Sequence, residues 1–391
     1  MITFEESLEI VRTNAVLLPA ERVPLAESLH RVLREQVVSD IDMPPFNKSA
    51  VDGYACRKED SGEELTVIGT LAAGSPVALT VRKDQCVKIM TGAVMPGGAD
   101  CVLMVEEVEC TGEKKIRFKG TTPIPNICYK GEDVVAGDRL LSSGQRLTPK
   151  EIASLALAGY ADPTVSRKPR VGILATGDEI VEPSVVPRLS QIRNSNSFQL
   201  IAHAQQFGCD VTYYGIARDS NEAIGKLIQQ AKSENDLILL TGGVSAGELD
   251  LVPALLEKSG FRILFHGVSI QPGRPTVFGR SENKYVFGIP GNPVASFIVF
   301  ETIVKELLAV MMGLAAYRKV AVCRLGKAIR RQKTRRLGWR PVKISGDGVA
   351  VPLDYHGTAH ISAYANADGI VPIPVGISEV PEGSQVEVRL I

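Results

Sequence analysis

Strict alternation between short apolar runs and helical patterns, from residue 169 to 315, restricts the fold of this chain more than any other feature. The apolar runs predict strands at 171–175, 211–216, 237–240, 263–265 and 285–287, and the intervening patterns predict helices at 198–207, 221–233 and 251–258. This repetition is typical of a sheet with parallel strands and helices on both faces. We therefore expect a doubly wound α/β domain at the centre of an α/β multidomain chain.

The segments on either side of this alternation have a different pattern. Short strand-like runs separated by Gly and Pro clusters predict an inserted β module, and similar runs after Tyr317 predict a small C-terminal β domain. Helical patterns on both sides of the module predict a discontinuous helical/mixed N-terminal domain. The expected division is domain I at 1–44 and 141–168, domain II at 45–140, domain III at 169–316 and domain IV at 317–391.

Composition excludes several classes of protein. The 44 basic and 44 acidic residues cancel, so no overall field attracts nucleic acid or an anionic membrane. Seven scattered cysteines without a C-x-x-C pair suit a reducing cytosol. The longest apolar helical pattern, Val294 to Met312, is interrupted by charges at Glu301, Lys305 and Glu306. We expect a cytoplasmic protein with no nucleic-acid partner and no membrane partner.

Three apolar runs of the central domain end in similar turns: GILATGDE (172–179), LLTGGVSAGE (239–248) and VFGIPGNP (286–293). The carboxyl ends of parallel strands meet at one edge of a sheet, where such sheets bind ligands. Glycines there let backbone amides approach an anion, and carboxylates can hold a cation. The residues expected around this crevice are Thr176, Asp178, Glu179, Thr241, Glu248, Asp250 and Asn292. We expect an oxyanion and metal site, although each turn alone can be only a tight connection with solvated acids.

Three further segments carry polar residues in compact loops. FNKSAVDGYA (46–55) contains Asp52 and suits a recognition loop, and KIMTGAVMPGGAD (88–100) adds another Thr-Gly turn. In IQPGRPTVFG (270–279), Arg274 stands between two prolines and can clamp an oxyanion with two hydrogen bonds. In each of these loops a plain surface turn is the alternative.

Other patterns argue against particular chemistries. His356 and His360 stand in HGTAH, without the glutamate of a zinc-binding H-E-x-x-H helix, so zinc is not expected. A phosphate-binding G-x-x-x-x-G-K-[ST] loop is absent from the sequence, so a Walker ATPase is not supported, and an α/β-hydrolase nucleophile is not expected. A basic run is expected to form a solvated face; it comprises Lys327, Arg330, Arg331, Lys333, Arg335 and Arg336.

Seven motifs occur in an order that resembles the molybdopterin molybdenumtransferase family, which includes the bacterial MoeA proteins and the E domain of gephyrin. They are FNKSAVDGYA, KIMTGAVMPGGAD, ILATGDE, RNSNS, LTGGVSAGELD, QPGRPTVFG and GIPGNPVAS, and the resemblance covers nearly the whole chain. It implies an enzyme that receives adenylylated molybdopterin, releases AMP and inserts molybdate between the dithiolene sulfurs, assisted by Mg²⁺. It also implies a homodimer, with the site in a cleft between the β module of one subunit and the α/β domain of the other.

The resemblance also assigns roles to residues. It implies catalytic roles for Asp52, Thr91, Glu179, Asp219 and Asp250, with Glu179 and Asp250 as expected metal ligands. The expected cofactor-binding residues are Thr176, Gly177, Gly242, Gly243, Ser245, Arg274, Pro290, Gly291, Asn292 and Pro293. The chain departs from the family at Gln271, where a lysine is frequent, and at Asn194, where an aspartate is frequent.

Partners and alternatives follow from the same resemblance. We expect a molybdopterin adenylyltransferase upstream, and cofactor-processing or acceptor proteins downstream. One alternative is a non-catalytic molybdopterin-binding or scaffold protein with the same fold. A second is the tungstate-inserting counterpart, because the two oxyanions have nearly the same size and charge. A third, the adenylyltransferase that acts one step earlier, is disfavoured because that activity needs only the α/β unit.

Overall fold

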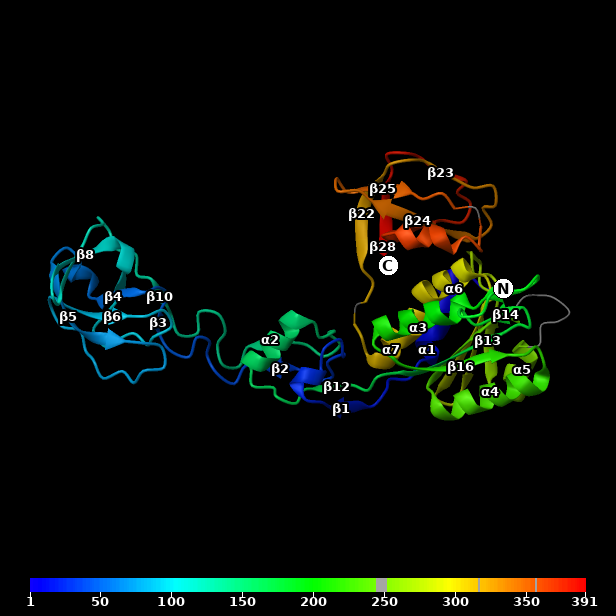
Figure 1. The fold of residues 1–391 in the computed structure, drawn as a ribbon, viewed down its shortest axis with the longest axis horizontal. Helices are drawn as coiled ribbons and strands as arrows, with labels where there is room; N and C mark the ends of the chain where they lie inside the picture. Colours follow the sequence, from blue (N-terminus) through cyan, green and yellow to red (C-terminus); the bar gives the residue numbers. More distant parts are fainter. Residues whose placement is uncertain (244–251, 316, 356) are drawn as a thin grey trace. The chain divides into compact units, whose positions relative to one another are not determined.

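The computed structural model describes residues 1–243, 252–315, 317–355 and 357–391 (Figure 1). Four residues named above, Ser245, Glu248, Asp250 and His356, lie outside these ranges. The chain divides into two compact units: the first comprises 1–34, 143–148 and 163–391, and the second comprises 35–142 and 149–162. This division does not test the four domain boundaries proposed from the sequence, which stay a prediction.

The second unit contains the β module. Its sheet has the strand order β7 (Cys101–Met104), β4 (Gly53–Cys56), β6 (Gln85–Ile89), β5 (Glu64–Leu71), β9 (Lys115–Phe118) and β8 (Val108–Gly112). Two short ladders join β10 (Ile127–Cys128) to β3 (Lys48–Ser49) and β11 (Arg139–Leu141) to β2 (Val37–Val38). Helix α2 (Pro149–Leu157) and the 3-10 turns at Lys58–Asp60 and Val105–Glu107 complete the unit. Because successive strand residues face opposite ways, Tyr54 and Ala55 pack into separate cores on the two faces.

The first unit is built on a six-stranded sheet. Its strand order is β16 (Asp210–Ala217), β13 (Arg170–Thr176), β17 (Leu237–Thr241), β21 (Lys284–Ile289), β20 (Val277–Ser281) and β18 (Arg262–His266). The first four strands are parallel, and β20 is antiparallel to both of its neighbours. The β17 strand LILLT is buried along its whole length because helices cover both of its faces.

Helices lie on both faces of this sheet, as the alternation predicted. Helices α3 (Ser195–Phe207) and α6 (Pro293–Val299) contribute to one core, whereas α4 (Asn221–Glu234) and α5 (Val252–Lys258) contribute to the other. Local sequence fixes the helix ends. Asn194 and Ser220 accept backbone hydrogen bonds as N-caps, and Gly208 ends α3 in the left-handed conformation.

The predicted long helix from 294 to 312 is interrupted. Helix α6 passes into a π-helical turn, Phe300–Val304, before α7 (Lys305–Met312). Glu301, a charged residue of this π-helical turn, is buried, with only 2% of its surface exposed. No helix within the described part of the chain is both long enough and apolar enough to cross a membrane.

The remaining elements flank this core. Helix α1 (Phe4–Asn14) begins with a capping box between Thr3 and Glu6 and packs on α7. The ladder of β1 (Ala20–Arg22) with β12 (Thr164–Ser166) follows, together with the 3-10 turn Leu25–Glu27. The C-terminal sheet has the order β19 (Ile270–Gln271), β24 (Leu337–Ile344), β25 (Val349–Pro352), β22 (Val320–Leu325), β28 (Gln385–Leu390) and β26 (Gly369–Ile373). Strands β23 (Ile329–Arg330) and β27 (Glu379–Val380) pair beside it, and a 3-10 helix spans Ile361–Asn366.

Candidate functional site

The carboxyl ends of β13, β17 and β21 lie side by side. Thr241 pairs with Ala175 on one side and with Ile289 on the other, and the Gly242 amide donates to the Ile289 carbonyl at 3.2 Å. A Cβ atom on Gly242 would lie 2.5 Å from the carbonyl oxygen of Thr176, so only glycine fits there. The described parts of the three loops therefore meet at one edge of the sheet, as the motifs predicted. We call this place the crevice.

The wall of the crevice contains an unpartnered hydroxyl. Thr176 Oγ1 is buried and has no hydrogen-bond partner among the described residues. It lies 2.8 Å from where a Cβ of Gly242 would be and 3.3 Å from where a Cβ of Gly243 would be. A buried polar atom without a partner is costly in the free protein, so this hydroxyl is available to an oxygen or nitrogen of a ligand.

Carboxylates gather at the same ends of β13 and β16. The Asp178 amide donates to Asp219 Oδ2 at 3.4 Å, and the Asp219 amide donates to Asp178 Oδ1 at 3.3 Å. Glu179 is exposed, and one of its oxygens lies 2.6 Å from where a Cβ of Gly177 would be. Within the described ranges, no group of three or more His, Cys, Asp or Glu side chains is arranged to hold a metal. Asp250, the second expected metal ligand, lies outside those ranges.

The PGNP loop, residues 290–293, joins β21 to α6 along the crevice. Asn196 Nδ2, from the first turn of α3, donates to the Gly291 carbonyl at 2.6 Å. A Cβ on Gly291 would lie 3.8 Å from the Cα atom of Gly242, so this loop and the Gly242–Gly243 turn are neighbours. Sequence reasoning quoted RNSNS as a motif and missed the role of Asn196, because nothing local shows that its amide reaches a loop 95 residues away.

In the second unit, Asp52 and Thr91 are directly bonded. Asp52 precedes β4 and Thr91 follows β6, and these strands are antiparallel neighbours. The Thr91 amide and its Oγ1 both donate to Asp52 Oδ1, at 2.7 and 2.9 Å. The backbone hydrogen bond from Thr91, followed by the hydroxyl bond, holds the pKa of Asp52 below its ordinary value. Asp52 is therefore an exposed, ionised acceptor.

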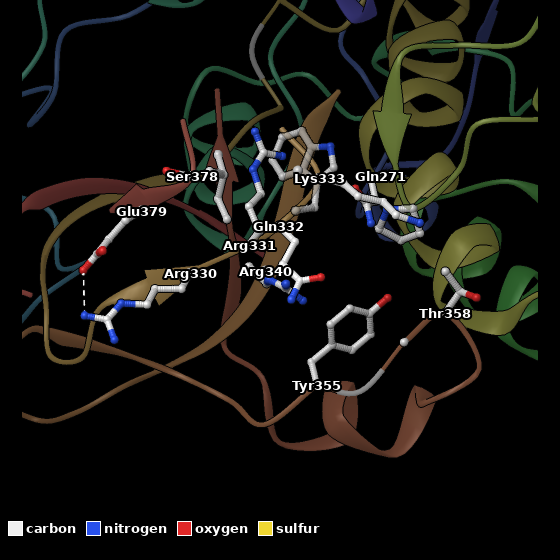
Figure 2. A pocket seen from close by; sticks show the side chains of 15 residues that line it. Gln271, Arg330, Arg331, Gln332, Lys333, Arg340, Tyr355, Thr358, Ser378 and Glu379 are labelled. Carbon is white, nitrogen blue, oxygen red and sulfur yellow. Dashed lines mark ion pairs between the residues drawn. The ribbon is translucent and has the colours of Figure 1, made fainter. Parts of the chain in front are cut away.

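A second concave site in the first unit has a volume of about 760 Å³ (Figure 2). It lies between the turn after β19 and the C-terminal sheet. Its lining residues are Gln271, Pro272, Arg330, Arg331, Gln332, Lys333, Gly338, Trp339, Arg340, Tyr355, Gly357, Thr358, Ile373, Ser378 and Glu379. We call it the basic pocket. Part of the basic run that was expected to form a solvated face therefore lines a cavity.

The positively charged side chains of the basic pocket make different contacts. Arg330 forms an ion pair with Glu379 at 3.1 Å, drawn as a dashed line in Figure 2. Arg331 donates to three backbone carbonyls at 2.6 to 2.8 Å and so holds the loops of the pocket together. Lys333 and Arg340 take part in no ion pair among the described residues, and the Arg340 guanidinium lies 5.2 Å from the centre of the Tyr355 ring.

Neutral side chains also line the pocket. The indole nitrogen of Trp339 is buried without a hydrogen-bond partner in the described structure. Gln271 and Pro272 line the wall, whereas Arg274 of the same turn is exposed and is not a lining residue. The signal in the sequence was the combination of basic residues with Trp339 and Tyr355, which suits an anion site better than a solvated face.

A doubly wound α/β domain, a β module and a C-terminal β domain with a basic pocket together define a multidomain α/β protein. Three family profiles match this chain: "MoeA N-terminal region (domain I and II)" at residues 2–159, "Probable molybdopterin binding domain" at 172–309 and "MoeA C-terminal region (domain IV)" at 323–391. The chain belongs to the molybdopterin molybdenumtransferase family.

Individual relatives agree over the full length. The molybdopterin molybdenumtransferase of Staphylococcus epidermidis is 35% identical, covering 100% of this chain and 95% of the relative. The molybdopterin molybdenumtransferase of Haemophilus influenzae is 34% identical, covering 94% of this chain and 93% of the relative. A crystal structure of the molybdopterin biosynthesis moeA protein from Pyrococcus horikoshii OT3 has a TM-score of 0.84 at 32% identity and covers 100% of both chains. This protein is accordingly a transferase of molybdenum cofactor biosynthesis.

Proposed function

We propose that this transferase inserts molybdate into adenylylated molybdopterin and releases AMP, with Mg²⁺ assisting. The observation that carries the proposal is that the first unit contains two separate places suited to anions. The crevice and the basic pocket are joined by a hydrogen bond from the Val294 amide, just after the PGNP loop, to the Thr358 carbonyl in the pocket wall, at 3.1 Å. Two anionic substrates require two such places.

The crevice suits the larger substrate. Release of AMP breaks the anhydride bond between the adenylyl phosphorus and the phosphate of molybdopterin, with the oxygen of water passing to phosphorus. Gly242 and Gly243 lie so close to Thr176 and Val252 that no side chain fits on them, and the Thr176 hydroxyl beside them has no partner among the described residues. Asp178, Glu179 and Asp219 stand at the neighbouring strand ends, where they can position a water molecule or a cation.

The basic pocket suits molybdate. Molybdate is a tetrahedral dianion, which binds best where donors and positive charge outnumber acids. Lys333 and Arg340 provide these donors, and the one lining acid, Glu379, is neutralised by Arg330. Gln271 in place of a lysine leaves this pocket with one positive charge fewer.

The donor set at the crevice fits Mg²⁺ in the way this ion usually binds beside phosphates. Mg²⁺ takes one or two carboxylates and fills its remaining positions with water and substrate phosphate oxygens. Glu179 is exposed and supplies such an oxygen, and Asp250 is the proposed second ligand. When bound, the ion would neutralise charge on the phosphates of the substrate. A Glu179→Gln variant that needs no more Mg²⁺ than the wild-type protein would contradict this assignment.

Further parts of the proposal rest on the family resemblance alone. These are the homodimer, an upstream molybdopterin adenylyltransferase, downstream acceptor proteins and a cytoplasmic location. The roles of Asp52 and Thr91 in the reaction belong to the same group. An analytical ultracentrifugation run that shows only monomers would contradict the homodimer.

The reaction is tested by incubating the full-length protein with adenylylated molybdopterin and Mg²⁺, with and without molybdate, and following AMP. The proposal predicts AMP release that increases with molybdate. No molybdate-dependent AMP would favour the scaffold alternative. A larger increase with tungstate than with molybdate would favour the tungstate-inserting counterpart.

A further inference from the structure

Asn196 uses only one half of its side-chain amide within the protein. The residue is 9% exposed, and Nδ2 donates to the Gly291 carbonyl at 2.6 Å. The other atom, Oδ1, is buried and accepts no hydrogen bond from any described residue. A buried carbonyl oxygen without a donor is rare and needs an explanation.

A role in capping α3 does not explain this residue. Asn194 is the N-cap, and its side chain is fully used: Oδ1 accepts from the Ser197 amide at 3.1 Å, and Nδ2 donates to the Tyr213 hydroxyl at 2.8 Å. Asn196 stands two residues further along, where helix formation requires no side-chain acceptor. Ser197 Oγ and both amide atoms of Gln199 in the same helix are also buried without a partner, but only the Asn196 side chain is bonded to the PGNP loop among these three residues.

The position of Asn196 connects it to the crevice. Its amide touches Gly291, which neighbours Gly242, and Gly242 in turn packs against the Thr176 backbone. Thr176 Oγ1 is the second buried oxygen without a partner at this edge of the sheet. Two unused hydrogen-bonding atoms thus belong to side chains that contact adjoining loops of one crevice.

We propose that Asn196 is a specificity-determining residue for molybdopterin: Nδ2 holds the PGNP loop, and Oδ1 accepts a hydrogen bond from an N–H group of the pterin. This inference rests on the proposed function, because it takes molybdopterin as the occupant of the crevice. Pterins carry amide and amino N–H donors, which match a buried acceptor. A site that is built to accept such a bond discriminates strongly against ligands that lack the donor.

The experiment compares Asn196→Ala with Asn235→Ala as a matched control. Asn235 is also buried, and its Nδ2 donates to the Ala231 carbonyl at 3.0 Å and to the Tyr214 hydroxyl at 2.6 Å, but it precedes β17, at the opposite end of the parallel strands. The first measurement is hydrogen exchange of the ligand-free proteins. The amides of Gly291, Asn292 and Val294 should exchange at least threefold faster in Asn196→Ala than in the control or in the wild-type protein.

The second measurement is the dissociation constant for molybdopterin itself, without the adenylyl group. Loss of one hydrogen bond to the ligand should raise it about tenfold in Asn196→Ala and leave it unchanged in Asn235→Ala, with similar melting temperatures. Asn196→Asp keeps acceptor oxygens but loses the N–H donor to the Gly291 carbonyl. Hydrogen exchange in the PGNP loop should therefore be fast in this variant, whereas its affinity for molybdopterin should fall less than that of Asn196→Ala.

The outcomes separate this inference from the proposed function. Wild-type protein that binds molybdopterin but releases no AMP contradicts only the proposed reaction, and a weaker Asn196→Ala complex then still supports the inference. Equal affinity in the two alanine variants overturns it. Unchanged exchange at residues 291–294, or no molybdopterin binding by the wild-type protein, also overturns it.

Discussion

The Val294 amide donates to the Thr358 carbonyl at 3.1 Å. Val294 follows the PGNP loop of the crevice, and Thr358 lines the basic pocket. The two anion-accepting places are therefore connected through one hydrogen bond and one short loop. If the pocket holds molybdate and the crevice holds the adenylylated cofactor, this bond fixes the wall of one site relative to the other.

Replacement of Arg340 by alanine should weaken the response to molybdate. Arg340 lines the basic pocket and has no ion pair among the described residues, so its charge is available to an anion. We expect about tenfold more molybdate to be needed for half-maximal AMP release, equivalent to about 1.4 kcal/mol. Arg335→Ala is the control, because Arg335 belongs to the same basic run but does not line the pocket. Equal effects of the two variants would contradict a specific pocket.

Replacement of Gln271 by lysine should have the opposite effect. Gln271 lines the pocket and is exposed, so a lysine there is solvated when the pocket is empty and adds a positive charge beside a bound dianion. The molybdate concentration at half-maximal rate should fall about threefold. A rise, or no change at low ionic strength, would show that this side chain does not face the oxyanion.

Replacement of Asp52 by asparagine should reduce AMP release at least tenfold with little loss of stability. The amide oxygen of asparagine can still accept the bonds from Thr91, so the turn is kept while the charge is removed. Little change in the unfolding free energy is expected for this exposed residue. Full activity of the variant would remove Asp52 from the reaction.

The same pair makes a prediction about pH. Because the Thr91 backbone and hydroxyl bonds lower the pKa of Asp52, its contribution to stability is present above the unfolded pKa of about 3.9. It is lost as the pH falls through the lower, folded pKa. Thr91→Val removes the hydroxyl bond, so the Asp52 pKa should move up toward its ordinary value. Carbon NMR titration of the Asp52 carboxyl measures this shift, and an unchanged pKa would refute the assigned cause.

Replacement of Glu301 by glutamine should destabilise the first unit. Burial raises the pKa of Glu301, but the His203 hydrogen bond and the charge of Lys305 outweigh burial and hold the pKa below its ordinary value. His203 Nδ1 lies 3.2 Å from Glu301 Oε1, and Lys305 pairs with the same oxygen. Loss of the charge leaves Lys305 buried without its partner, which costs about 3 kcal/mol.

Fluorescence of Trp339, the only tryptophan, reports this unfolding in denaturant. The exposed residue Glu379 provides the control, since Glu379→Gln breaks only a surface ion pair, which contributes little to stability. Equal shifts of the unfolding midpoint in the two variants would contradict a structural role for the buried cluster.

The sequence predicted the order of elements in the α/β domain because periodicity is a local property. It did not predict β20 as a strand, so the antiparallel pairing of β20 with β18 and β21 was also missed. The β20 to β21 hairpin turns at Glu282 and Asn283, with Glu282 in the left-handed conformation at φ 53°, and this pair is not among the usual Asn-Gly signals. The sequence also did not predict the π-helical turn at Phe300–Val304, because this segment contains neither Gly nor Pro to mark an interruption of the helix.

The candidate site was predicted in part for a related reason. Glycines and acids at strand ends indicated the crevice, because topology brings such ends together. The partners of Asn196 and the lining of the basic pocket depend on contacts between segments far apart in sequence, which no local pattern encodes. Arg331 is an example. It was expected on a solvated face, but its guanidinium donates hydrogen bonds to the carbonyls of Arg336, Pro374 and Ile377 and so holds these segments together.

The most direct test of molybdate insertion is the ratio of AMP released to molybdenum incorporated. Wild-type protein with adenylylated molybdopterin, Mg²⁺ and molybdate should release one AMP for each molybdenum atom recovered in the cofactor, and release should fall to background without molybdate. AMP release at the same rate in the absence of molybdate, with no molybdenum in the recovered cofactor, would contradict the account.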